Sequence, residues 1–190
     1  MTYKKGILAG LLIGIGGFAY LSSPIKEIGA FLFALGLLGV IIFGCSLYTG
    51  KIGYIESIKQ LPVCALICAE NFLGAIFCGI LSSEFIKKNA AKVVSAKLAL
   101  SFPQIFIKAF FCGIMIYLAV ELYRREKNIF LVIMAIMIFI LCGFEHCVAN
   151  AFYFAAAGTF SFKALLLILT CIIGNALGSL FIKILNDFEI

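Results

Sequence analysis

The chain has 190 residues, of which 64% are hydrophobic and 13% charged, and its mean hydropathy is +1.19. Soluble domains of this size are about half apolar, so the composition indicates an integral membrane protein and excludes a separate soluble domain. The net charge of +6 is spread over the ends of apolar stretches. It lacks the long basic run or aromatic interleaving of a nucleic-acid surface, so we predict no nucleic-acid partner.

Six apolar stretches follow one another along the chain, and a membrane-spanning helix needs about 20 such residues. They cover residues 6–21, 28–48, 61–81, 98–120, 129–157 and 164–185. The fifth is too long for one ordinary span and has the polar sequence GFEH in its middle. We predict an all-α membrane protein with six transmembrane helices in one domain, residues 1–190.

The first stretch is interpreted as a retained span. Lys4 and Lys5 precede it as in a signal peptide, but no small-residue cleavage site follows;. Gly6, Gly10 and Gly14 recur every four residues, which is typical of a helix-packing face;. Placing both termini in the cytoplasm puts the basic cluster RREK, residues 124–127, on the inner side, as the positive-inside rule favours;.

Two halves of the chain repeat one pattern, a polar, glycine-containing break in the middle span and then an asparagine with a small-residue step in the last span. The segments are GCSLYTGKIGY (44–54) with ENFLGAIF (70–77), and GFEHCVANAF (143–152) with GNALGSLF (174–181). Three spans per half is an odd number, so the halves must run in opposite directions. We predict an inverted 3+3 repeat with halves 1–83 and 90–190, spans 2 and 5 broken, and a site at the repeat interface.

His146 is the only histidine, and it lies in an apolar stretch with Glu145 beside it and Asn150 one helical turn on. Ionisable groups at membrane depth are costly and persist where they face a bundle interior or a wet cavity. Broken helices survive in a membrane under the same condition, and an inward-pointing helix N-terminus favours an anion. His146 is therefore a candidate site residue, although a lone buried histidine can also be purely structural.

The motif GFEHCVAN, residues 143–150, resembles the signature of the formate/nitrite transporter family, and GCSLYTG, residues 44–50, resembles the loop that breaks its second span. KGILAGLLIGIGGFAYL, residues 5–21, is similar to the family's first span. The family forms pentameric anion channels with an aquaporin-like pore in each protomer. The resemblance therefore implies a homopentamer and a pore in this chain.

The resemblance also implies roles for individual residues. Leu47, Tyr48 and Thr49 would form a mobile loop with Thr49 facing His146. The remaining implied pore residues are two apolar constrictions and one vestibule cation: Leu37, Phe139 and Lys97. Three positions depart from the family pattern and leave the substrate open: Ser46 for an acid, Gly113 for an asparagine, and Glu70 for a small residue. We expect no regulation through the longer terminal segments often found in the family.

An apolar constriction is a barrier to a bare anion, whereas the neutral acid crosses more easily. Formate, nitrite and hydrosulfide each become neutral by taking up one proton. A histidine with an unperturbed pKa of about 6.5 is suited to donate it. We predict proton-assisted permeation of these small anions, in which Lys97 attracts the anion and Thr49 hydrogen-bonds it.

Several polar residues are predicted to support the breaks rather than bind substrate. We expect Glu145 to hydrogen-bond backbone rather than His146, since adjacent residues do not share a helix face. Asn150, Asn71 and Asn175 are predicted to tie broken backbone ends, and Glu70 to be a polar tie beside a break. Lys108 is expected to extend its ammonium toward the interface.

The eight cysteines lie in apolar segments without a CxxC pair, which favours packing over disulfides or metal binding;. We predict no metal, no cofactor and no enzymatic activity. A haem or redox protein is one alternative, although bis-histidine ligation would need a second histidine, and a non-transporting membrane scaffold is another. The predicted location is the plasma membrane, with several passes through the bilayer.

Overall fold

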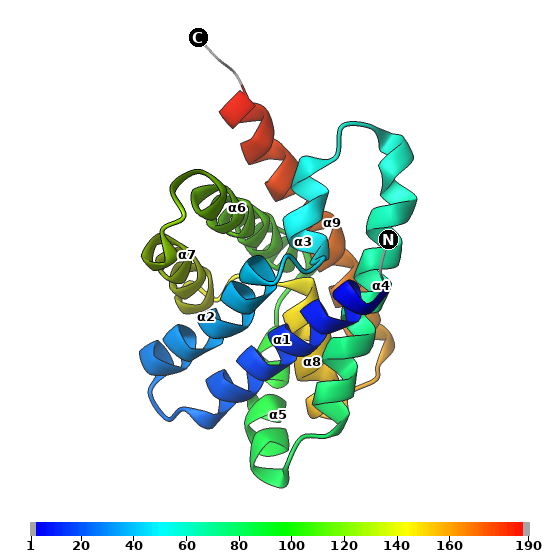
Figure 1. The fold of residues 1–190 in the computed structure, drawn as a ribbon. Coiled ribbons are helices and arrows are strands. Elements are labelled where there is room, and N and C mark those ends of the chain that lie inside the picture. Colours follow the sequence, from blue (N-terminus) through cyan, green and yellow to red (C-terminus); the bar gives the residue numbers. More distant parts are fainter. Residues whose placement is uncertain (1–2, 188–190) are drawn as a thin grey trace.

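The computed structural model describes residues 3–187, and every regular element in that range is helical (Figure 1). The elements are α1 (Tyr3–Ser22), α2 (Lys26–Ile42), α3 (Tyr48–Lys51), η1 (Ile52–Tyr54), η2 (Ile58–Gln60), α4 (Leu61–Ile80), α5 (Glu84–Leu98), α6 (Phe102–Glu126), α7 (Ile129–Leu141), α8 (Cys147–Ala156) and α9 (Phe162–Asp187). The predicted all-α class is confirmed.

Within residues 3–187, four helical segments are long and apolar enough to cross a membrane, namely Lys4–Ser22, Ile58–Ile80, Phe102–Glu126 and Phe162–Asp187. The other two predicted spans contain shorter helices. In the second, α2 has 17 residues and ends at Ile42. The fifth is divided into α7, with 13 residues, and α8, with 10.

The outer surface of the bundle carries many large apolar side chains. They come from several different helices and include Leu35, Leu73, Phe77, Phe130 and Ile173, each at least 55% exposed. So much exposed apolar surface is far beyond that of a soluble monomer. The chain is a membrane protein, and these side chains are suited to contact lipid or other protein chains.

The helix α5 was not predicted from the sequence. Its segment EFIKKNAAKVVSAKL is polar, and only Ile86, Ala90 and Val94 are buried, one per turn. The predicted fourth span, 98–120, therefore begins too early. The apolar helix α6 starts at Phe102, after a capping box formed by Ser101 and Gln104;.

The helices pack as two similar groups. In one, α1 lies between α2 and α4; in the other, α6 lies between α7 and α9 (Figure 1). Contacts of α2 with α7 and of α4 with α8 join the groups. Glycines allow the closest approaches: a Cβ on Gly10 would overlap the Asn71 carbonyl, and one on Gly113 the Asn175 carbonyl. The predicted packing face of the first helix is confirmed, since Gly6, Gly10 and Gly14 all face α4.

We expect Gly113→Ala to lower the free energy of unfolding by about 1–3 kcal/mol, because the added methyl would force α6 away from the backbone of α9. Gly39→Ala is the matched control, since its Cβ would meet only the flexible Leu12 side chain, at 3.4 Å. Thermal midpoints in detergent measure the difference. Equal midpoints for the two variants would contradict this description of the α6–α9 contact.

Candidate functional site

Both α2 and α7 end in the same way. Gly44 and Gly143 follow them with positive φ angles of 58° and 66°. The next amide then bonds back into the helix, Cys45 N–H to Val40 O and Phe144 N–H to Phe139 O, each at 2.9 Å. This is a Schellman motif, in which a left-handed glycine satisfies the last carbonyls. The sequence places a glycine at each point where the backbone must turn.

After each turn, three residues without regular structure lead into a new helix, and the last of the three is extended. Leu47 (φ −102°, ψ 129°) precedes α3, and His146 (φ −102°, ψ 120°) precedes α8. The two breaks therefore place Thr49 and His146 at helix starts. They also leave buried backbone groups that need hydrogen-bond partners.

Asn71 of α4 satisfies the first break. Its Oδ1 accepts from Tyr48 N–H at 2.7 Å, and its Nδ2 donates to Ser46 O at 2.8 Å and to Gly6 O at 2.9 Å. Asn71 is fully buried. One carboxamide thus holds both sides of the break, and it also fastens the break to α1, a contact that was not predicted.

Asn175 of α9 makes the same set of bonds at the second break. Its Oδ1 accepts from Cys147 N–H at 3.0 Å, and its Nδ2 donates to Glu145 O and to Ala109 O, both at 2.8 Å. It too is fully buried. The prediction that Asn71 and Asn175 tie broken backbone ends agrees with the structure in both cases.

The two breaks meet at Thr49 and His146, both buried. The Thr49 Oγ1 lies 2.9 Å from His146 Nε2, as the resemblance implied. The backbone N–H of Ala149 donates to His146 Nδ1 at 3.1 Å, so the imidazole caps α8. Because Nδ1 accepts a hydrogen bond, the neutral ring carries its proton on Nε2 and donates it to Thr49.

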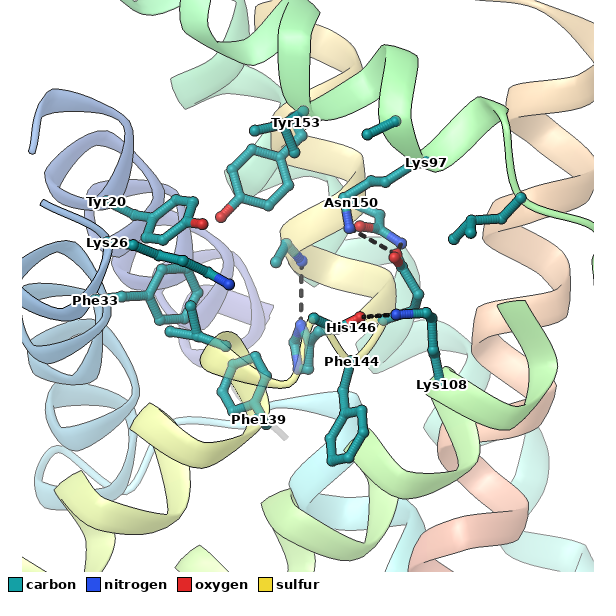
Figure 2. A pocket seen from close by; sticks show the side chains of 17 residues that line it. Tyr20, Lys26, Phe33, Lys97, Lys108, Phe139, Phe144, His146, Asn150 and Tyr153 are labelled. Carbon is teal, nitrogen blue, oxygen red and sulfur yellow. Dashed lines mark hydrogen bonds and ion pairs between the residues drawn. The ribbon is translucent and has the colours of Figure 1, made fainter. Parts of the chain in front are cut away.

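One cavity reaches this contact, and a second lies beside the first break. The large cavity, about 300 Å³, is lined by residues of α1, α2, α5, α6, α7 and α8 and reaches His146 (Figure 2). The small cavity, about 140 Å³, is lined by Leu37, Leu47, Gly50, Lys51 and Val120, among others.

Apolar side chains line both cavities. The Phe139 ring lies 6.1 Å from the His146 ring and 5.9 Å from that of Phe33, with which it packs edge to face. Phe139 lines the large cavity and Leu37 the small one. Tyr48 is set apart from both: its hydroxyl donates to Ile172 O at 3.2 Å.

Glu145 forms an ion pair with Lys97, with Oε2 and Nζ 2.7 Å apart, and the same oxygen accepts from Asn150 Nδ2 at 2.8 Å. The Glu145 side chain is 3% exposed and that of Lys97 13%. The prediction that Glu145 and Asn150 bond the broken backbone is therefore wrong. The Glu145 carboxylate instead pairs with the Lys97 ammonium and accepts from the Asn150 side chain.

The structure also corrects the prediction for Glu70. Its side chain is buried on α4 against Gly6 of α1, and it makes no hydrogen bond with the part of the chain described, residues 3–187. It lies beside the first break without tying it. The neighbouring Asn71 takes up the backbone groups there.

Sequence reasoning missed a third buried carboxylate, Glu121 of α6. It accepts from Tyr54 Oη at 2.7 Å and from Arg125 Nε at 2.6 Å, so it fastens the segment after α3 to α6. A glutamate four residues before an arginine was the available signal. Ser179 adds a further contact: its hydroxyl lies 3.0 Å from Gly113 O and 3.4 Å from Thr49 O, so its one hydrogen is directed at one of these carbonyls or shared between them.

No group of three or more histidine, cysteine or acidic side chains within residues 3–187 is arranged to hold a metal ion. The described cysteines are free thiols, and seven of the eight are buried.

A model of the formate/nitrite transporter family matches residues 2–187 of the chain. The chain belongs to the formate/nitrite transporter family. It is 29% identical over 177 residues to the uncharacterized transporter YrhG of Bacillus subtilis, a match covering 80% of this chain and 66% of that protein. It is 25% identical over 183 residues to the formate channel FocA of Haemophilus influenzae, covering 80% of this chain and 64% of that one. The matches thus span slightly less than two thirds of these relatives.

Solved structures share the fold. A pentameric formate channel with formate bound superimposes with a TM-score of 0.78 at 22% identity, covering 97% of this chain and 94% of that one. A formate/nitrite transporter family ion channel gives a TM-score of 0.85 at 20% identity, covering 97% and 87%. The predicted family resemblance is confirmed, and the relatives with an assigned activity are channels and transporters.

We expect Asn175→Asp to destabilise the protein by about 1–3 kcal/mol, since the carboxylate keeps the bond from Cys147 N–H but cannot donate to two buried carbonyls. Asn128→Asp is the matched control, because Asn128 caps α7 through its side-chain oxygen alone. Thermal midpoints in detergent compare the variants. If the thermal midpoint of Asn175→Asp equals that of the wild type, the hydrogen bonds of Asn175 at the second break do not stabilise the fold.

Proposed function

We propose that the chain is a transmembrane channel for the small monovalent anions of weak acids: formate, nitrite or hydrosulfide. The observation that carries the proposal is the Thr49–His146 contact, buried where the two breaks meet. His146 lines the large cavity, and Leu47 and Gly50, on either side of Thr49 in the chain, line the small one. Membership of the formate/nitrite transporter family supports the same substrate class.

The proposed channel domain comprises residues 1–190 and contains an inverted 3+3 repeat with halves 1–83 and 90–190. Spans 2 and 5 are broken, and α2 with α3 and α7 with α8 form their parts. The matching contacts of Asn71 and Asn175 support this symmetry. So do two lysines, since Lys5 Nζ donates to Gly44 O at 3.3 Å and Lys108 Nζ to Gly143 O at 3.1 Å.

We infer that five copies assemble in the plasma membrane with both termini in the cytoplasm. A pentameric formate channel has the same fold, which supports the assembly. In this orientation the large cavity opens outward and the small cavity, with Lys51, opens inward. Each protomer would hold its own pore, with Leu37 and Phe139 as apolar constrictions and Leu47, Tyr48 and Thr49 as the adjustable segment.

The geometry constrains how His146 could assist permeation. A neutral ring that gave up its Nε2 proton would become an imidazolate, so Nδ1 must first take a proton from water in the large cavity. That proton turns Nδ1 into a donor and breaks its bond from Ala149 N–H. Nε2 then passes its proton to the anion at Thr49, and the neutral acid crosses the constriction. The ring resets when Nδ1 gives its proton back to water and Nε2 takes one up from water. One proton accompanies each anion.

The alternatives have less support. Both ring nitrogens of the single histidine have partners within the protein, Thr49 and Ala149, so neither is directed at a haem iron. A non-transporting scaffold gives no reason for a hydrogen-bonded histidine at the meeting point of two broken helices.

The test is anion flux into proteoliposomes, with formate, nitrite, hydrosulfide and chloride measured in parallel between pH 5 and 8. Chloride is the control anion, because it cannot become a neutral acid in this range. We expect flux of the weak-acid anions that increases as pH falls, and little chloride flux. Chloride crossing as fast as the weak-acid anions would contradict the proposal.

His146→Asn should lower formate flux at pH 7 by about 10²-fold, at the low end of what a positioned acid or base contributes. It should also remove the protein's own pH dependence, because a carboxamide does not exchange protons in this range. Cys142→Ser is the control, since Cys142 is exposed in the same break and lines neither cavity. An unchanged pH profile in His146→Asn would remove the imidazole from the mechanism.

A further inference from the structure

Three lysines line the large cavity, Lys26, Lys97 and Lys108, and one carboxylate lies among them, Glu145. The sequence predicts Lys97 as the cation that attracts the anion. In the structure Lys97 is already paired with Glu145 at 2.7 Å, so this pair contributes little net charge. The excess positive charge of the cavity comes from Lys26 and Lys108.

These two lysines approach the cavity from different helices, Lys26 from α2 and Lys108 from α6 (Figure 2). Each ammonium donates to a backbone carbonyl near the end of α7: Lys26 Nζ to Leu141 O and Lys108 Nζ to Gly143 O, both at 3.1 Å. The two carbonyls are two residues apart, so both ammonium groups are held at the rim of the second break. Their position is fixed by the backbone rather than by a carboxylate.

Neither Lys26 nor Lys108 forms an ion pair with any residue between 3 and 187. An ammonium has three donor hydrogens, and the carbonyl bond uses one of them. Each ammonium therefore has two further donors, and no carboxylate among residues 3–187 is paired with it. The carbonyls orient the side chains without cancelling their charge.

We propose that Lys26 and Lys108 form an anion-capture site in the large cavity, for one small monovalent anion such as a short carboxylate. Phe139 and His146 line the same cavity, so an anion bound at this site lies next to the Phe139 constriction. The inference rests on the proposed channel function and assigns the capture step to residues other than Lys97. Lys97 and Glu145 are instead positioning residues that hold Asn150.

Charge focused by low-dielectric walls raises the local concentration of a counter-ion by about 10–10³-fold. Capture by two lysines should therefore set the concentration at which flux is half maximal, and not the maximal flux. The effect should weaken in high salt, where the Debye length falls to about 3 Å at 1 M.

The experiment measures formate uptake as a function of formate concentration for Lys26→Met, Lys108→Met and the double variant. For the double variant we expect the half-saturating concentration to rise at least tenfold, with maximal flux within about twofold of wild type. Increasing ionic strength with an impermeant salt should bring wild type close to the double variant.

Two controls separate charge from structure. Lys163→Met removes an exposed lysine that does not line the cavity. Lys5→Met removes a lysine that bonds the Gly44 carbonyl at the first break as Lys108 bonds that of Gly143 at the second. Both should leave half-saturation near the wild-type value. A double variant that shifts half-saturation no more than these controls, or that lowers only the maximal flux, overturns the capture site.

Thermal stabilisation of the detergent-solubilised protein by formate provides a readout independent of flux. Formate should raise the melting temperature of wild type and of Lys163→Met, and raise it much less in the double variant. If wild type carries no weak-acid anion yet shows this difference, the channel proposal fails and the capture site stands. If wild type carries formate but the variants match it in both assays, the capture site alone is wrong.

Discussion

The structure depends on one interaction that occurs twice: a buried asparagine bonds the backbone on both sides of the point where a new short helix begins. A carboxamide has one acceptor oxygen and two donor hydrogens, which match the one amide and two carbonyls that Asn71 and Asn175 each satisfy;. Without these bonds the breaks would leave unpaired backbone groups in an apolar bundle, each costing about 1–3 kcal/mol. With them, two helix starts can meet in the interior.

The chemistry of the site follows from that meeting. Because His146 is the cap of α8, its ring is held with Nδ1 on Ala149 N–H and Nε2 toward Thr49. The fold therefore favours the tautomer with its proton on Nε2. A second proton, on Nδ1, would break the bond from Ala149 N–H in the first turn of α8. The lysines of the large cavity have two kinds of partner. Glu145 forms an ion pair with Lys97, whereas Lys26 and Lys108 donate to backbone carbonyls, which do not offset their charge.

Sequence motifs located the glycine turns, the Asn71 and Asn175 ties and the proximity of Thr49 to His146, because each depends on residue types at fixed places in the chain. The motifs did not predict the side-chain partners of Glu145 and Asn150. Glu145 pairs with Lys97 of α5, a helix whose apolar stripe is too narrow to be recognised in the sequence, and Asn150 bonds Glu145. The direction of a side chain at a helix break is set by what packs opposite. For the same reason the sequence did not show that Lys97 is paired with a carboxylate whereas Lys26 and Lys108 bond backbone carbonyls.

The fold holds a neutral His146 with its proton on Nε2, where Thr49 accepts it. Because the chain has a single histidine, nitrogen NMR of histidine-labelled protein in lipid gives one unambiguous pair of ring signals. At neutral pH we expect a protonated Nε2, an unprotonated Nδ1 and a through-bond or dipolar contact from Nδ1 to the Ala149 amide hydrogen. A ring protonated on Nδ1 with a bare Nε2 would contradict this assignment.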